Sequence, residues 1–188
     1  AYSRHVFETV GGYDERLVRT EDNEMHYRLR KNGFKFYYNP EVRSFHISRG
    51  SLRALLKQKY SNGLWIGLTM GIQPRCFSLR HFIPLFFVLV LLGSVLSVMI
   101  KNFWQPLIVL AVIYLISALF FSFESMKKAK PNVKIICLGL PAVFFLIHFA
   151  YGLGTAIGLI KMPYFVLKNH NYNLPFPIKA EKEERQNG

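Results

Sequence analysis

The pattern of hydrophobic and polar residues changes character at Phe82. Beyond this point, three runs contain no Asp, Glu, Lys or Arg, at 82–100, 102–123 and 135–160. Each run is long enough for a helix to cross the roughly 30 Å hydrocarbon core of a bilayer. Buried helices of soluble proteins seldom continue so long without a polar face. The pattern therefore predicts three transmembrane helices at these positions.

Before the apolar runs, apolar and polar residues alternate in shorter segments, and the first two of these have the spacing of a helix. The stretch from His5 to Val10 predicts a short helix that Gly11 and Gly12 end. The stretch from Thr20 to Asn32 predicts a second helix, with Thr20 suited to its N-cap and Gly33 to its stop.

Strand-type alternation follows. Phe34, Phe36 and Tyr38 alternate with Lys35 and Tyr37, which predicts a half-buried strand, and a second strand is expected from 42 to 47. Ser51 then caps an amphipathic, basic helix to Tyr60 that suits a membrane interface or the surface of a sheet. The order helix, strand, turn, strand predicts an α/β fold class, at the far edge of a sheet.

The second predicted helix carries the candidate chemistry. Glu21 and Asp22 lie in its first turn, where the helix dipole favours the ionised carboxylate. Asp22 shares a face with Met25 and Leu29, so its carboxylate should lie at the mouth of a core and accept a proton from a bound hydroxyl. Capping alone also explains acidic residues in a first turn. We expect Glu24 and Arg28, four residues apart, to pair on the solvent-exposed face.

The net charge of +13 is unevenly distributed. Seven Lys or Arg and no Asp or Glu lie between Val42 and Arg80, directly before the first apolar run. Such a segment predicts attraction to an anionic leaflet, and no recognised nucleic-acid-binding signature occurs. We therefore expect membrane lipids and no nucleic acid as partners. Cys76 and Cys137 have neither metal-ligand spacing nor a disulfide framework.

Three stretches together resemble the acceptor half of family 2 glycosyltransferases, over roughly residues 2–65: Gly11-Gly12-Tyr13-Asp14-Glu15-Arg16-Leu17, Thr20-Glu21-Asp22, and the run from Arg28 to Pro40. These are inverting enzymes of the GT-A nucleotide-diphospho-sugar transferase fold. The resemblance implies an α/β fold followed by an α-helical transmembrane region. It implies that Asp22 is the catalytic base and that Glu21 and Arg28 position its helix.

Further residues enter through the same resemblance. Gln58-Lys59-Tyr60-Ser61-Asn62-Gly63 is similar to the version found in succinoglycan-type exopolysaccharide glucosyltransferases, so Gln58 is expected to contact acceptor or donor. His46 would contact the donor diphosphate or its metal, or would be an ordinary core or surface histidine. The family implies a divalent cation, Mg or Mn. No Asp-x-Asp occurs, so we expect its main ligands before Ala1, and expect a C-terminal fragment that is inactive alone.

Basic residues predict the orientation of the apolar runs. Lys127, Lys128, Lys130 and Lys134 mark the connection from 124 to 134 as cytosolic, on the same side as residues 1–80. We therefore expect a multi-pass protein of the cell membrane with a cytosolic catalytic part. The third run is rich in glycine, with Gly154 and Gly158 at a spacing typical of helix packing. It either spans the bilayer or lies partly in the membrane interface. The basic residues after it favour the interface, whereas the length of the run favours a span.

The predicted organisation has four parts: an acceptor-side transferase part at 1–65, a basic juxtamembrane segment at 66–81, transmembrane helices within 82–160 and a polar tail at 161–188. The predicted function is transfer of a sugar from a nucleotide-sugar donor to a saccharide or lipid-linked acceptor in cell-surface polysaccharide synthesis. Two alternatives remain: transfer to polyprenyl phosphate, and a membrane-anchoring module without chemistry.

Overall fold

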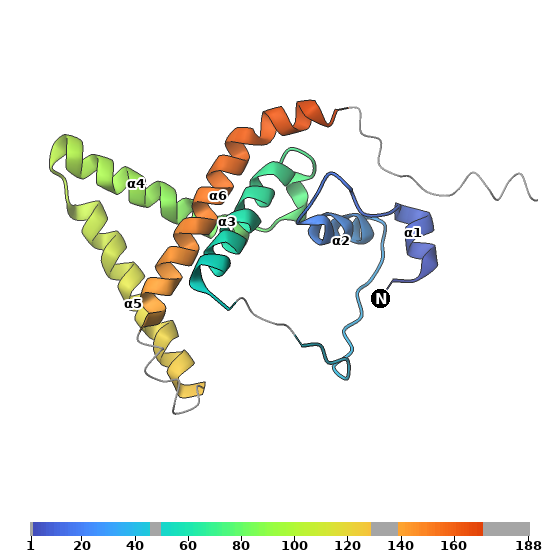
Figure 1. Cartoon of the computed structure of the whole chain (residues 1–188), viewed down its shortest axis with the longest axis horizontal. Helices are drawn as coiled ribbons and strands as arrows, with labels where there is room; N and C mark the ends of the chain where they lie inside the picture. The colour runs from blue at the N-terminus through green and yellow to red at the C-terminus, as the bar shows by residue number, and fades with distance from the viewer. Residues whose placement is uncertain (1, 46–49, 129–138, 171–188) are drawn as a thin grey trace, which may run out of the picture.

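The computed structural model describes residues 2–45, 50–128 and 139–170, and every regular element in these ranges is a helix (Figure 1). The elements, in chain order, are α1 (Arg4–Val10), α2 (Glu21–Lys31), α3 (Leu52–Thr69), η1 (Pro74–Cys76), η2 (Leu79–Phe82), α4 (Ile83–Lys101), α5 (Gln105–Lys128) and α6 (Leu140–Lys168).

The predicted α/β fold class is wrong for the described residues, because they contain no strand. The alternating segment from Phe34 is an irregular, largely exposed stretch, in which Tyr37 is 89% and Tyr38 82% exposed. The second expected strand is also irregular up to Phe45, and its remainder lies outside the described residues. A strand needs a neighbour for its backbone hydrogen bonds. No neighbouring strand lies in the described ranges, so alternation alone does not produce one.

Helices α1 and α2 share the small core of the N-terminal part. Val6 and Val10 of α1 pack against Met25 and Leu29 of α2, which are almost completely buried. Gly33 ends α2 with a φ of +81°, and the Phe34 N–H donates to the Leu29 carbonyl at 3.0 Å. This is a Schellman stop, which a glycine at positive φ permits. The predicted termination of α2 is therefore confirmed.

Helices α3 and α6 run side by side and make the most extensive contact between any two described elements. A Cβ added at Gly63 or Gly67 of α3, or at Gly154 or Gly158 of α6, would lie within 3 Å of the other helix's backbone. The packing role expected for the α6 glycines is confirmed. The matching pair four residues apart on α3, a helix nearly twice as long as predicted, was missed.

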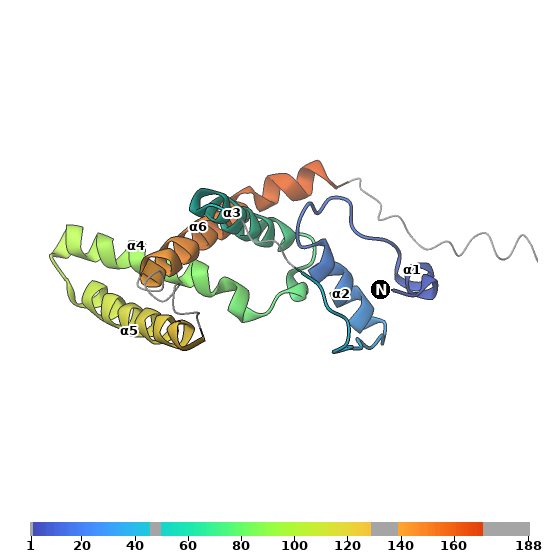
Figure 2. The same ribbon diagram turned by 60° about the horizontal axis from the view of Figure 1, so that its bottom comes forward.

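Three described helices are long and apolar enough to cross a membrane: Leu79–Lys101, Gln105–Lys127 and Leu140–Lys168. They match the three predicted runs; positions 135–138 of the third run lie outside the described residues, and its helix continues to Lys168. Figure 1 and Figure 2 show that α4 and α5 form a hairpin that projects away from α1 and α2. Asn102 turns the chain at its tip with a φ of +49°. Many apolar side chains on both helices are exposed, as expected of surfaces that face lipid.

Candidate active site

The two predicted carboxylates begin α2 and face a pocket of about 380 Å³. Asp22 is exposed, and its Oδ1 accepts a hydrogen bond from the Asn23 backbone N–H at 2.8 Å. Its other oxygen accepts no hydrogen bond from the part of the chain that the structure describes. The carboxylate is thus oriented by one bond and keeps one oxygen available to a ligand.

Four other segments complete the pocket, which therefore lies where the N-terminal helices meet the apolar helices. Its lining residues come from the loop before α2 and its first turn, from α3, from η2 and from α6: Arg19, Thr20, Glu21, Asp22, Asn23, Asn62, Ile66, His81 and Tyr151. Asn62, His81 and Tyr151 were not among the predicted site residues. Asn62 was detectable, because it follows Gln58 by four residues and shares its helix face.

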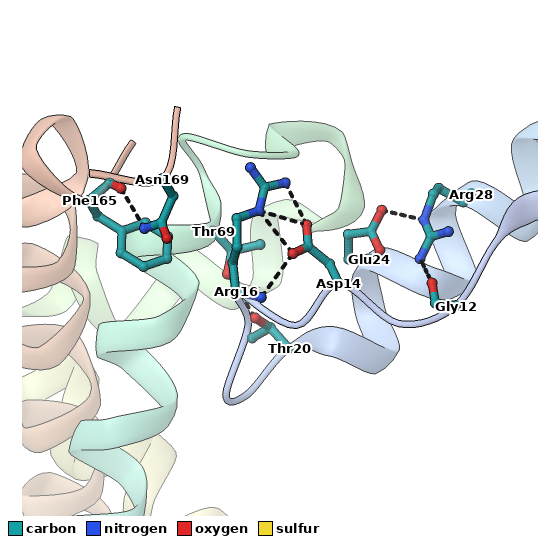
Figure 3. A network of polar contacts seen from close by, with 9 residues as sticks. All are labelled: Gly12, Asp14, Arg16, Thr20, Glu24, Arg28, Thr69, Phe165 and Asn169. Atoms are coloured by element: carbon teal, nitrogen blue, oxygen red, sulfur yellow. Dashed lines mark hydrogen bonds and ion pairs between the residues drawn. The ribbon is translucent and has the colours of Figure 1, made fainter. Parts of the chain in front are cut away.

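Thr20 links this pocket to the end of α3. Its backbone is left-handed, with a φ of 71°, and its hydroxyl does not cap α2. The predicted N-cap is therefore wrong in its chemistry. The Thr20 Oγ1 instead lies 2.7 Å from the Oγ1 of Thr69, and Figure 3 shows both residues. The Thr20 hydroxyl also donates to the Arg19 carbonyl. Beside this link, the Arg19 guanidinium donates to the Asn62 side-chain carbonyl at 2.8 Å. Two bonds from α3 thus hold the loop that precedes the carboxylates.

Arg28 ties α2 to the loop after α1. Its Nε donates to Glu24 Oε1 at 2.6 Å and its Nη2 to the Gly12 carbonyl at 2.7 Å (Figure 3). Its Nη1 donates to the Val10 carbonyl at the end of α1. The predicted Glu24–Arg28 pair is present, but the predicted solvent-exposed position is wrong, because Glu24 is only 3% exposed. The pair lies against the loop carbonyls, which need buried donors.

A second buried ion pair shapes that loop. Asp14 is almost completely buried and accepts from the Arg16 backbone N–H at 3.0 Å and from the Arg16 guanidinium through both oxygens (Figure 3). A bidentate pair of this kind fixes geometry as well as charge. The residues that carry the family resemblance between Gly11 and Leu17 therefore form a braced turn next to α2.

The other predicted site residues are Glu21, Gln58 and His46, and among those that the structure describes only Glu21 lines the pocket. Glu21 lines the pocket, and its Oε2 is buried with no hydrogen-bond partner in the described ranges. Gln58 lies on α3, one turn before Asn62, and does not line the pocket. His46 lies outside the described residues. Within these ranges, no group of three or more His, Cys, Asp and Glu side chains fits a metal ion, so the expected divalent cation has no ligand set there.

Two titratable groups near the carboxylates have shifted pKa values. Burial raises the pKa of the Cys76 thiol to about 12, and the negative charge of Glu24 adds to the shift. Burial also raises the pKa of the Tyr2 hydroxyl, with smaller contributions from Tyr13 and from the charge of Asp22. Both groups are therefore neutral at pH 7.

Comparison with known proteins identifies a family and two relatives. The family model described as glycosyl transferase family group 2 matches residues 1–154. The chain is 28% identical over 149 residues to a dolichyl N-acetyl-alpha-D-glucosaminyl phosphate 3-beta-D-2,3-diacetamido-2,3-dideoxy-beta-D-glucuronosyltransferase of Methanococcus voltae, covering 79% of this chain and 42% of that protein. It is 28% identical over 93 residues to the succinoglycan biosynthesis protein ExoA of Rhizobium meliloti (strain 1021), covering 50% of this chain and 28% of that protein.

The chain thus spans less than half of the length of either relative. No solved structure matches it significantly.

Proposed function

Because the chain belongs to glycosyl transferase family group 2, we propose that it forms the acceptor-side part of a membrane-bound, inverting glycosyltransferase. The donor is a nucleotide sugar, and the acceptor is a saccharide, free or linked to a lipid, in cell-surface polysaccharide or glycolipid synthesis. The observation that carries this proposal is the position of Asp22. It is an accessible carboxylate at a helix N-terminus, in a polar pocket that α3, η2 and α6 complete.

In this reaction Asp22 is the general base. It removes the proton from an acceptor hydroxyl while that oxygen attacks the anomeric carbon of the donor. The new glycosidic C–O bond forms as the bond to the nucleoside diphosphate breaks. Attack from the face opposite the leaving group inverts the anomeric configuration.

The neighbouring residues of the pocket bind and orient the acceptor. The buried, unpartnered Glu21 Oε2 accepts a hydrogen bond from a second hydroxyl of the sugar, since an unsatisfied buried acceptor is costly without one. Arg28 supports the first turn of α2 through its hydrogen bonds to Glu24 and to the Gly12 carbonyl of the preceding loop. No residue of this chain is assigned to the nucleotide or to a cation.

The membrane placement rests on the apolar helices and the basic residues beside them. Lys127 lies at the end of α5. In the sequence, the basic segment 66–81 separates the transferase residues 1–65 from the α4–α5 hairpin. We place the transferase part on the cytosolic side, because basic residues favour that side. A site held at the leaflet meets lipid-linked acceptors in two dimensions, which raises their effective concentration.

A second acceptor class is a polyprenyl phosphate. It is favoured by Arg19, whose guanidinium lines the pocket and forms no ion pair with a described carboxylate. The Methanococcus relative is named for a dolichyl-linked sugar phosphate, on which the acceptor atom is a sugar hydroxyl. A phosphate acceptor is already anionic and needs no base, whereas a sugar hydroxyl does.

The test is Asp22→Asn in the full-length protein reconstituted in lipid, with Glu41→Gln as the matched carboxylate-to-amide control on an exposed loop. For a hydroxyl acceptor, we expect kcat to fall by about 10²–10⁴-fold while Glu41→Gln leaves it unchanged. A small loss with Asp22→Asn supports the phosphate acceptor. Wild-type protein without any transferase activity across a donor screen would support the anchoring module.

A further inference from the structure

Helix α6 begins beside α5, where its Phe145 and His148 rings lie 5.9 and 6.3 Å from the Tyr114 ring, and then crosses to the first turn of α4 (Figure 1). Its Gly152 lies against the carbonyl of Pro84, in the first turn of α4, and its His148 ring lies 6.2 Å from the Phe87 ring. We propose that α6 lies along the interface of the bilayer on the catalytic side, with both ends on that side, and does not cross. The inference rests on the proposed membrane placement of the α4–α5 hairpin.

The candidate site itself sets the depth of α6. Tyr151, near the middle of the helix, lines the pocket that contains Arg19, Glu21 and Asp22. If α6 crossed the bilayer from Leu140, Tyr151 would lie about 16 Å along its axis, close to the bilayer centre. The charged residues of the pocket would then lie there too, which is costly. An α6 in the interface keeps the pocket at the water boundary.

The close packing of α3 against α6 also favours a position of α6 in the membrane interface. Gly63 of α3 packs on Tyr151 and Thr155, and Gly67 packs on Thr155 and Leu159, so the two helices are parallel and their backbones touch. Helix α3 is not among the described helices with the length and composition to span a membrane, and it carries Lys57 and Lys59. Because backbones this close cannot separate, α3 would have to enter the bilayer with α6.

The surface of α6 that α3 leaves uncovered fits a lipid surface. Ile160, Tyr164 and Leu167 are 77%, 71% and 73% exposed, and their spacing of four and three residues places them on one face. The exposed Lys161 and Lys168 lie beside this stripe. Apolar residues in the acyl boundary, with lysines that reach the headgroups, are typical of a helix that lies in the interface.

Cysteine labelling of the full-length protein in oriented vesicles tests the side on which α6 ends. In a background with Cys76→Ser and Cys137→Ser, the test variant is Lys168→Cys, at the exposed last residue of α6. Tyr37→Cys is the reference for the catalytic side, and Phe103→Cys, between α4 and α5, is the reference for the far side. A membrane-impermeant maleimide is added to inside-out and to right-side-out vesicles.

We expect Lys168→Cys to label in the same vesicles as Tyr37→Cys and to lose labelling in the opposite ones. A crossing helix would carry Lys168 about 42 Å from Leu140, and labelling together with Phe103→Cys would overturn the proposal. So would protection from both sides, because an interfacial Lys168 is in water. Labelling of Tyr37→Cys and Phe103→Cys from one and the same side would instead contradict the membrane placement itself, and the inference with it.

The depth of nitroxide spin labels in the bilayer, measured along α6, provides a second test. Leu153, Ile160 and Leu167 follow one another by seven residues and lie on the same face, so each is replaced by a spin-labelled cysteine in turn. In the interface, the three labels report similar shallow depths. A series of depths that progresses by about 20 Å from the first to the last label would show that α6 crosses.

Discussion

The hydroxyl of Thr69 at the end of α3 lies 2.7 Å from the hydroxyl of Thr20, the residue before the two candidate carboxylates. Thr69 has no exposed surface, and Thr20 has a left-handed backbone that β-branched residues strongly disfavour. The unfavourable conformation of Thr20 persists because the hydrogen bond from α3 holds it. Helix α3, which packs on α6, therefore determines where α2 begins and where Asp22 points.

Replacing Thr69 by Val should lower turnover more than substrate affinity. The change keeps the shape of the side chain, removes the hydrogen bond to Thr20 and lets the first turn of α2 relax. With a bond worth about 1–2 kcal/mol, we expect kcat to fall roughly tenfold with little change in the KM of the donor. Steady-state kinetics of the full-length protein in lipid measures both.

Two further variants separate positioning from general damage. Thr69→Ser keeps the hydroxyl and should recover most of the turnover. Thr9→Val removes a hydroxyl that bonds within α1 on the exposed surface, and should change nothing. Equal losses in Thr69→Val and Thr69→Ser would show that packing matters at this position, and the hydrogen bond does not.

Replacing Arg28 by Met should loosen α2 from the loop after α1. The change leaves Glu24 buried without its cation and the carbonyls of Val10 and Gly12 without a donor. Loss of one partner of a buried pair costs about 3–5 kcal/mol, so amide protection in α2 should fall steeply in hydrogen–deuterium exchange. Arg30→Met, two residues further along α2 on its exposed surface, removes a guanidinium that lies over the Phe36 ring and should cost about 0.5–1 kcal/mol.

Adding the substitution Glu24→Gln to Arg28→Met checks the cause. An amide is cheaper to bury than an unpaired carboxylate, so the double variant should regain part of the lost protection. A double variant that is no better than Arg28→Met would assign the loss to the loop carbonyls instead.

Substitution of Gly67 or Gly158 by Ala should separate α3 from α6. At both positions a Cβ would lie within 3 Å of backbone atoms of the facing helix, which cannot yield as a side chain can. We expect a lower unfolding temperature in detergent and faster proteolysis. Gly93→Ala in α4 is the matched control, because a Cβ there meets nothing within 4 Å. It should leave stability unchanged or raise it by about 0.5–1 kcal/mol.

Cys76 should resist alkylation in the folded protein. Its pKa is raised to about 12, first by burial and then by the charge of Glu24, so the reactive thiolate is scarce at pH 8. In a Cys137→Ser variant, we expect iodoacetamide to react on the order of a thousandfold more slowly than after denaturation, where the thiol has a pKa of about 8.5. The rate should rise with pH well beyond pH 9.

The raised pKa of Cys76 lowers the free energy of unfolding at alkaline pH. Because the pKa is higher in the folded state, the contribution of the neutral thiol is fully present below about pH 8.5. It is lost as the pH rises toward 12, since the unfolded chain releases the proton first. A Cys76→Ser variant, whose hydroxyl stays neutral, should lack this alkaline loss; identical pH profiles would place Cys76 in water.

Local patterns were sufficient wherever a local force decides the structure. The three apolar runs predicted three apolar helices, Gly33 predicted the end of α2, and the spacing of Met25 and Leu29 predicted the buried face of α2. In each case the deciding interaction lies within a few residues of the chain, or is the preference of an apolar surface to leave water.

The tertiary structure alone decided what depends on a distant partner. The alternation from Phe34 did not become a strand, because no neighbouring strand accompanies it in the described ranges. Thr20 points to Thr69 and away from its own helix, and Asn62, His81 and Tyr151 enter the pocket from three separate elements. Which residues meet depends on how α3, α6 and the carboxylate-bearing α2 pack together, and the cost of burying charge then determines where that assembly can lie relative to a bilayer.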